Sequence, residues 1–145
     1  MNNQTTMHVR PFQLADEAAV IALWQHCGLT RPWNDPHKDI QRKLSVQPEL
    51  FLVGTVDDAV VATAMIGFDG HRGWLYYLAV APDYRQRGYG GQLMAEAEQR
   101  LIELGCPKLQ LMVRPDNVGV FDFYQLLGYD ITEVVVLGKR LIDDE

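Results

Sequence analysis

The chain has 145 residues, of which 48% are hydrophobic and 22% charged, and its formal net charge is −6. This length and composition suit one globular domain whose core is large enough to need neither a metal nor a disulfide. The acidic charge and the lack of any run of Lys and Arg argue against nucleic acid as a partner.

The start of the chain is short and polar, so residues 1–7 are expected to form a flexible tail rather than a signal peptide. No window approaches the roughly 18 apolar residues of a membrane span. Cys27 and Cys106 show neither CxxC spacing nor a histidine at ligand spacing, which indicates small buried residues and no metal site. We therefore expect a cytoplasmic protein without a membrane partner and with a single domain at residues 8–142.

The first half of the chain predicts strands and two helices. Asp16 and Asp35 are typical N-cap residues, and Pro36 stands at the first position of the second helix. Asp57-Asp58 separates two β-rich runs, which indicates a hairpin. The expected elements are a strand at 8–12, helices after Asp16 and Asp35, and strands at 50–56, 60–68 and 74–80.

Beyond residue 80, helical and strand patterns alternate. Leu93, Ala97 and Leu101 share one helical face, and Gly105 is typical of the position after a helix end. The expected elements are a loop at 82–91, a helix that ends before Gly105, a strand at 108–113, a helix at 117–127, a strand at 131–137 and a further short strand at Leu141 and Ile142. Antiparallel strands followed by strands joined through helices predict an α+β fold with a mixed sheet.

The loop at residues 80–91 has a phosphate-binding pattern. It leads from a strand into a helix, and the unpaired N–H groups and partial positive charge of a helix N-terminus suit a phosphate. Three glycines permit close approach and positive φ, and two arginines add charge. These residues are Gly88, Gly90, Gly91, Arg85 and Arg87. Leu93 stands where a dinucleotide fingerprint needs glycine, and no Gly-Lys-Ser/Thr is present for a P-loop. A tight strand-to-helix connection with solvent-facing arginines explains the local pattern equally well.

A second segment, Asn117–Tyr129, places Tyr124 on an apolar helix face, where it could simply belong to the core. Together the two segments resemble the GNAT superfamily of acetyl-CoA-dependent N-acetyltransferases. The first matches V-x-P-x-x-R-x-x-G-x-G/A, and the second resembles N-x-x-A-x-x-F-Y-x-x-x-G-F/Y with Val120 in place of alanine. The resemblance implies the GNAT fold, a mixed and mostly antiparallel sheet with helices on both faces. Residues 31–36, 69–73 and 138–142 resemble one bacterial acetyltransferase of this superfamily, whose acceptor is not settled.

The resemblance implies acetyl-CoA as donor and a role for each motif. Loop N–H groups would hold the pyrophosphate. The strand before the loop would diverge from the strand after the loop helix and pair with the pantetheine arm, and an N–H near Leu78 would polarise the thioester carbonyl. Asn117 would bond the arm from the other side, and Tyr124 would protonate the departing thiolate as the catalytic general acid. The implied acetyl-CoA-binding residues are Leu78, Ala79, Val80, Arg85, Gln86, Arg87, Gly88, Tyr89, Gly90, Gly91, Asn117 and Tyr124.

The general base and the acceptor are less defined. Many family members carry a glutamate as base on the strand before the loop, but residues 74–78 contain no carboxylate. Asp69, His71 or a water chain are the alternatives for deprotonating an amine. Arg31, Trp33 and Asn34 lie where the family builds its acceptor wall, and an aromatic ring there could stack on a substrate cation. Core packing explains Trp33 equally well.

Two functions are compatible with these motifs. The first is direct acetyl transfer in a ternary complex to a small-molecule or peptide amine, since no activated nucleophile is visible to carry the acetyl group. The second is a non-catalytic domain of the same fold that senses acyl-CoA and regulates a partner. The intact Tyr124 favours catalysis, and the missing glutamate favours sensing. The resemblance also allows a homodimer.

Overall fold

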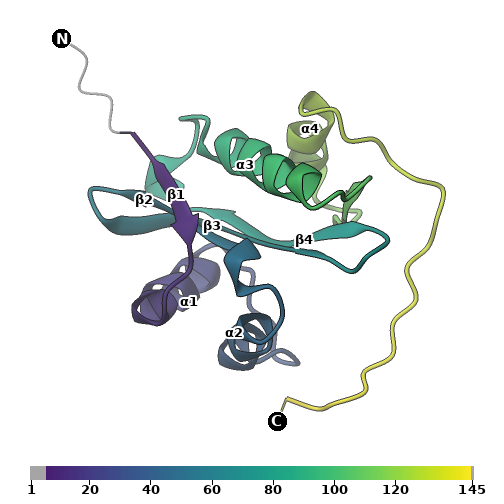
Figure 1. Cartoon of the computed structure of the whole chain (residues 1–145), viewed down its shortest axis with the longest axis horizontal. Coiled ribbons are helices and arrows are strands. Elements are labelled where there is room, and N and C mark those ends of the chain that lie inside the picture. The colour runs from purple at the N-terminus through teal and green to yellow at the C-terminus, as the bar shows by residue number, and fades with distance from the viewer. Residues whose placement is uncertain (1–5, 145) are drawn as a thin grey trace.

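The computed structural model describes residues 6–144 and has a five-stranded sheet with helices on both faces (Figure 1). The strands are β1 (His8–Pro11), β2 (Phe51–Val56), β3 (Ala59–Phe68), β4 (Gly73–Val80) and β5 (Leu109–Leu111). The α-helices are α1 (Glu17–His26), α2 (Pro36–Leu44), α3 (Tyr89–Glu103) and α4 (Val118–Leu126). Short 3₁₀ turns occupy Leu14–Asp16, Pro48–Leu50 and Pro82–Tyr84. Of the helices between residues 6 and 144, none combines the length and apolar character needed to cross a membrane.

The strands follow one another across the sheet in chain order. β1 to β4 are antiparallel, and Asp57 and Asp58 form the predicted hairpin turn between β2 and β3, both with positive φ. β5 pairs with β4 in parallel, which requires a crossover, and α3 supplies it. Figure 1 shows α1 and α2 on one face of the sheet and α3 and α4 on the other. The predicted α+β fold, with a mixed and mostly antiparallel sheet, is confirmed.

The two faces of the sheet carry separate hydrophobic clusters. On the α1 and α2 side, Trp24, Ile40 and Phe51 are fully buried, and Phe12 stacks on Phe51. On the α3 side, the core is built from aliphatic side chains of α3, β2 and β3. Every residue of β2 is buried, as expected for a strand covered on both faces. Residues of β4 contribute to both clusters, so the strand is packed on both faces of the sheet.

The structure differs from the sequence-based predictions near both ends of the chain. Residues 1–5 of the predicted tail lie outside the described residues, whereas Met7 is buried in the core and would meet any side chain added at Gly54. Residues 129–144 contain no strand, so the strands predicted at 131–137 and at Leu141 and Ile142 are wrong.

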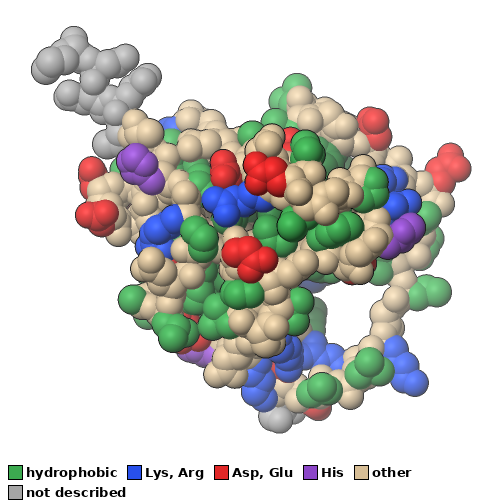
Figure 2. Space-filling model, viewed as in Figure 1, with side chains coloured by type: hydrophobic (Ala, Val, Ile, Leu, Met, Phe, Trp, Pro, Cys, Tyr) green, Lys and Arg blue, Asp and Glu red, His purple; other side chains and the backbone are tan. Residues whose placement is uncertain are grey.

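The reason lies in how the C-terminal segment, residues 130–144, is attached. Its β-branched run has the composition of a strand, but a strand needs a partner. Tyr129 bonds Glu98 at one end of the segment and Asp144 bonds Arg42 at the other, so the chain spans from α4 to α2 instead of pairing with β5. The side chains between remain 58% to 92% exposed and are Ile131, Val134, Val135, Val136, Leu137, Leu141 and Ile142. Figure 2 shows an opening between this segment and the body of the domain.

Candidate active site

The active-site candidate begins where β4 and β5 separate. Their parallel pairing covers only Gly73–Leu75 against Leu109–Leu111, although β4 continues to Val80. Within the described residues, the edge of β4 from Tyr76 to Val80 that faces away from β3 therefore has no strand partner. This is the divergence that the resemblance to the GNAT superfamily implied, and it leaves backbone groups open to an extended ligand.

A β-bulge lies in this open part of β4. Tyr77 has φ of 54°, and the pairing of β3 with β4 shifts register between Thr63 and Met65. The carbonyl of Tyr77 accepts a 2.8 Å hydrogen bond from the Thr63 hydroxyl on β3. Because no peptide bond in the described chain is cis, the N–H of Leu78 points the opposite way, toward the open edge.

The loop after β4 ends at the N-terminus of α3. Gln86 and Gly88 both have positive φ, at 63° and 80°, and Gly88 is the N-cap of α3. Gly88 offers no capping side chain, and the N-terminus of a helix suits an anion. Arg85, Gln86 and Arg87 are exposed beside this terminus, and Arg85 also donates to the last carbonyl of β4 at 3.1 Å. The backbone and charge of this loop fit a pyrophosphate.

Only one of the three loop glycines has the expected conformation. Gly90 and Gly91 lie inside α3 without positive φ, so that part of the prediction is wrong. A side chain at Gly90 would instead place its Cβ 3.1 Å from Cζ of Phe123 on α4. Gly90 is therefore a packing residue that lets α4 lie against the first turn of α3. The Tyr89 side chain is buried, so only its backbone can reach a ligand.

Tyr124 lies on α4, in the turn that contacts α3. It is 8% exposed and packs edge-on against Phe123 and Tyr129, with ring centroids 5.0 and 5.8 Å away. Burial raises the pKa of the Tyr124 phenol to about 12, so it stays protonated at neutral pH. Among the described residues its hydroxyl has no hydrogen-bond partner. Asn117, the N-cap of α4, is exposed and makes no capping bond, which leaves its amide available.

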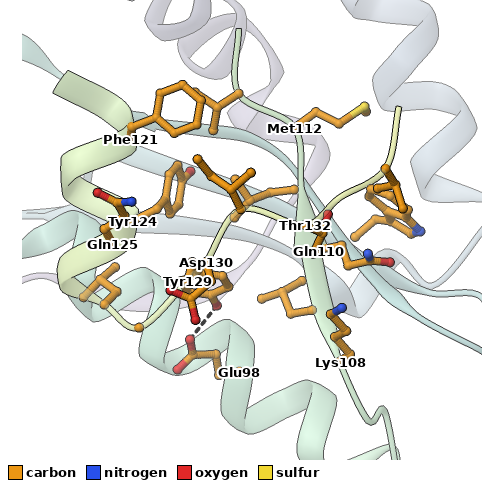
Figure 3. Close-up of a pocket in the computed structure, with 18 of the residues that line it drawn as sticks. Glu98, Lys108, Gln110, Met112, Phe121, Tyr124, Gln125, Tyr129, Asp130 and Thr132 are labelled. Carbon is orange, nitrogen blue, oxygen red and sulfur yellow. Dashed lines mark hydrogen bonds between the residues drawn. The ribbon is translucent and has the colours of Figure 1, made fainter. Parts of the chain in front are cut away.

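Tyr124 also lines a cavity of about 1070 Å³, together with β5 and side chains of the C-terminal segment. Figure 3 shows Tyr124 and Phe121 extending from α4 into this space, with Tyr129 bonded to Glu98 at its margin. No residue from 85 to 91 lines the cavity. The open edge of β4 and the α3 N-terminus, rather than this cavity, therefore make up the candidate donor site.

The predicted acceptor residues lie between α1 and α2. Arg31 donates to two backbone carbonyls of its own loop, at 2.7 and 3.0 Å, and so shapes the loop. Trp33 is 55% exposed, which excludes core packing as its role. The side-chain oxygen of Asn34 accepts a hydrogen bond from Arg140 of the C-terminal segment. Asp35 caps α2 by accepting from the N–H of His37 at 2.9 Å, as predicted.

The structure adds residues that the sequence did not indicate. The Tyr77 hydroxyl donates to Asp39 of α2 at 2.7 Å. Asp144 accepts from Arg42 at 2.5 Å and from the N–H of Asp35 at 2.8 Å, and basic side chains gather beside α2 in Figure 2. No local pattern could have found these pairs, because each joins residues far apart in the chain.

Neither candidate base lies near the open edge. Asp69 accepts hydrogen bonds from the N–H groups of Arg72 and His71 inside the turn before β4, and these bonds lower the pKa of its carboxyl. This turn adjoins Gly73, the far end of β4, and Leu78 lies five residues further along the strand, a distance of about 16 Å. Asp69 and His71 are therefore too distant for direct proton transfer at Leu78.

Comparison with known proteins identifies relatives of the whole domain. The family described as acetyltransferase (GNAT) matches residues 15–129. An acetyltransferase of Yersinia enterocolitica is 52% identical over 139 residues, which cover 96% of this chain and 99% of the relative. Among solved structures, Ard1 from Thermoplasma volcanium has a TM-score of 0.76 at 27% identity and covers 87% of this chain and 84% of its own.

A second solved structure is the aminoglycoside acetyltransferase AAC(6')-Iy in complex with a bisubstrate analogue, CoA-S-monomethyl-acetylneamine. Its TM-score is 0.79 at 19% identity, with 95% of this chain and 100% of that chain covered, and at this identity it shows the shared fold alone. The fold and the 52% identity over nearly the whole length agree with the matched family. The chain therefore belongs to the GNAT family of acetyltransferases.

Proposed function

We propose that this chain transfers the acetyl group of acetyl-CoA directly to an amine of a small-molecule or peptide acceptor in a ternary complex. One observation carries the proposal. The edge of β4 from Tyr76 to Val80 has no strand partner among the described residues and leads into the N-terminus of α3, which has no capping side chain. Helix α4 packs against that terminus, with Tyr124 in the contacting turn. This arrangement supports a donor bound in extended form along β4, with Tyr124 as its proton source.

The donor is held mainly by backbone groups. Leu78, Ala79 and Val80 present the open edge of β4 to the pantetheine arm, and Asn117 bonds the arm from the α4 side. N–H groups from Gln86 to Gly91 bind the pyrophosphate, with Arg85 and Arg87 adding charge. The positive φ of Gln86 and Gly88 and the lack of a capping side chain at Gly88 support this assignment.

The reaction exchanges one bond for another. The amine nitrogen bonds to the thioester carbon while the carbonyl electron pair moves to oxygen, where the N–H of Leu78 stabilises the charge. Collapse of this intermediate breaks the carbon–sulfur bond, and Tyr124 donates its hydroxyl hydrogen to the leaving sulfur. The proton lost by the amine replaces it, so the net products are an amide and a thiol.

The acceptor must arrive as a free amine. An alkylamine of pKa about 10 is mostly protonated at neutral pH, so one proton has to leave before attack. Asp69 and His71 lie at the opposite end of β4 from Leu78. Tyr77 does not serve as base either, because its burial and its hydrogen bond to Asp39 raise the pKa of the phenol and keep it protonated. Water at the open edge takes this role. Trp33, exposed beside the loop with Arg31 and Asn34, offers an aromatic face to a cationic acceptor.

The alternative function is that of an acyl-CoA sensor without turnover. It is favoured by the lack of a carboxylate in β4. In that case the chain would bind acetyl-CoA and CoA through the same backbone groups, and Tyr124 would serve only as a packing residue. Acceptor turnover separates the two functions.

Two measurements test the proposal. Acetyl-CoA and CoA should both raise the melting temperature. At one hundred times the dissociation constant, either ligand should add about 2.7 kcal/mol to the free energy of unfolding, and ATP and NADH should add much less. An amine panel with acetyl-CoA, followed by thiol release, should then find polyamines, amino sugars or lysine-like amines ahead of anionic acceptors. Binding without turnover across the panel would favour the sensor. Equal stabilisation by ATP and NADH would refute the donor site.

A further inference from the structure

A short chain of buried hydrogen bonds ends at the bulge of β4. The indole N–H of Trp24 on α1 donates to the Thr63 hydroxyl oxygen at 2.9 Å, and this hydroxyl donates to the carbonyl of Tyr77 at 2.8 Å. Trp24 and Thr63 are both 0% exposed. A threonine hydroxyl has a single hydrogen, and Trp24 is only a donor, so the direction of both bonds is fixed.

This chain controls the orientation of one peptide group. The Tyr77–Leu78 peptide is planar and trans, so fixing its carbonyl toward Thr63 fixes its N–H toward the open edge of β4. Hydrogen bonds in a chain polarise one another, and a carbonyl that accepts from Thr63 makes the N–H of the same peptide a better donor. The Leu78 N–H is the group assigned above to the thioester carbonyl.

The conformation of Tyr77 needs such support. A bulky residue with φ of 54° is strained, and an unheld bulge could relax by rotating the Tyr77–Leu78 peptide. The Tyr77 ring stacks on Trp24 with centroids 3.7 Å apart and planes 11° apart. Trp24 therefore contacts the ring of Tyr77 directly and reaches its carbonyl through Thr63. The strained residue is thus held at its ring by Trp24 and at its carbonyl by Thr63.

We propose that Thr63, supported by Trp24, is a positioning residue that aims the Leu78 N–H at the thioester carbonyl. This inference rests on the proposed acetyl transfer. Neither side chain touches the donor, because both are buried beneath the sheet surface. Their effect passes through the Tyr77–Leu78 peptide, so it should appear in the state of the bound carbonyl and in turnover but not in the affinity for CoA, which has no carbonyl at that position.

The test uses acetyl-CoA labelled with ¹³C at the thioester carbonyl and the full chain. In the wild type, the bound carbonyl resonance should lie downfield of the free one, as expected for an oxygen that accepts a hydrogen bond. Thr63→Val keeps the shape and removes the hydroxyl, so the resonance should return toward the free position and kcat should fall roughly tenfold or more. The CoA dissociation constant should stay within about twofold. Thr63→Ser retains the hydroxyl and should restore both signals.

The control is Thr55→Val, which makes the same change at a buried threonine of β2. It should leave the carbonyl resonance and kcat unchanged. Trp24→Phe is a second test, which is needed if Thr63→Val does not fold. It keeps a ring stacked on Tyr77 but removes the donor to Thr63, so the resonance should move partway toward the free position. A wild-type carbonyl shift that persists in both Thr63→Val and Trp24→Phe would overturn the positioning role alone. Binding of acetyl-CoA with no carbonyl shift in the wild type would overturn the Leu78 assignment beneath it, and failure to bind CoA would overturn the proposed function.

Discussion

The hydroxyl of Tyr77 donates a 2.7 Å hydrogen bond to a carboxylate oxygen of Asp39. The bond joins the bulge of β4, which bears the proposed donor slot, to helix α2, which follows the proposed acceptor loop. Burial and the neighbouring Asp39 raise the pKa of the Tyr77 phenol, so the donor in this bond stays protonated throughout the physiological range. One residue thus belongs to both halves of the candidate active site.

Tyr77→Phe should separate these two halves. The variant keeps the ring on Trp24 but removes the bond to Asp39, so α2 loses one attachment to β4. We expect the acceptor KM to rise several-fold and stability to fall by about 1 kcal/mol, with CoA affinity unchanged. Tyr129→Phe is a matched control, because Tyr129 donates in the same way to Glu98, away from the acceptor loop. It should cost similar stability without raising the acceptor KM, and an equal rise in both variants would contradict the assignment.

Tyr124→Phe tests the general acid. Because the Tyr124 hydroxyl has no partner among the described residues, removing it leaves no group unpaired, and the melting temperature should change little. kcat should fall roughly 10²–10⁴-fold if the hydroxyl supplies the proton to the leaving sulfur. Thiols have pKa near 8.5, so the deficit should shrink as the pH rises past about 9. Turnover by the variant at the wild-type rate across the pH series would show that Tyr124 is a packing residue.

Gly88→Ala tests the loop more cleanly than a change at Gly90, whose side chain would push against Phe123. An added Cβ at Gly88 meets nothing within 4 Å, but φ of 80° strains any other residue by about 1–2 kcal/mol. We expect that loss of stability together with at least a tenfold weaker CoA affinity, measured by calorimetry. Gly28→Ala has the same strain at φ of 69° and the same empty surroundings, but lies outside the loop. It should lower stability alone, and a normal CoA affinity in Gly88→Ala would place the pyrophosphate elsewhere.

Asp144→Asn should show the pH dependence of the C-terminal attachment. The bond from Arg42, the N–H of Asp35 and then Arg140 lower the pKa of the Asp144 carboxyl below its usual range. A lowered folded-state pKa stabilises the protein above the unfolded value of about 3.9, and this contribution is lost as the pH falls further. The melting temperature of the variant should therefore lie below that of the wild type at pH 7, and the gap should narrow below about pH 4. Asp122→Asn, at an exposed position of α4, should show no such gap at either pH. A gap that is constant with pH would assign the effect to packing.

The sequence predicted what local patterns determine. Periodicity located α1, α2, α3 and α4, and Asp35 caps α2 as expected. Asp16 precedes α1 as predicted, but its carboxylate accepts hydrogen bonds from Arg10 and the N–H of Gln13 instead of capping the helix. The divergence of β4 from β5 was implied by the resemblance to the GNAT superfamily. The glycines show the limit, since the same residue type serves backbone conformation at Gly88 and packing at Gly90, and the partner of Gly90 is distant in sequence. The pairs Tyr77–Asp39 and Trp24–Thr63 are tertiary contacts without a local signal.

The segment after residue 129 shows a different limit. Val134, Val135, Val136 and Leu137 have strong strand propensity, yet propensity acts only where a partner strand is within reach. Here the attachments at Tyr129 and Asp144 decide the path of the chain. Local preference was thus overruled by the positions of two polar contacts, neither of which is visible in the apolar pattern itself.

The bond between the Asp35 N–H and the Asp144 carboxylate has a consequence for local opening. It joins residues 109 positions apart, so the protection of a single amide at the start of α2 depends on the far end of the described chain. Exchange of that amide with solvent deuterium measures how often the C-terminal segment detaches. Arg140 of the same segment bonds Asn34, so detachment of the whole segment would also release this contact with the acceptor loop. The exchange rate of this one amide therefore gives an upper limit on the lifetime of the contact between the C-terminal segment and the acceptor loop.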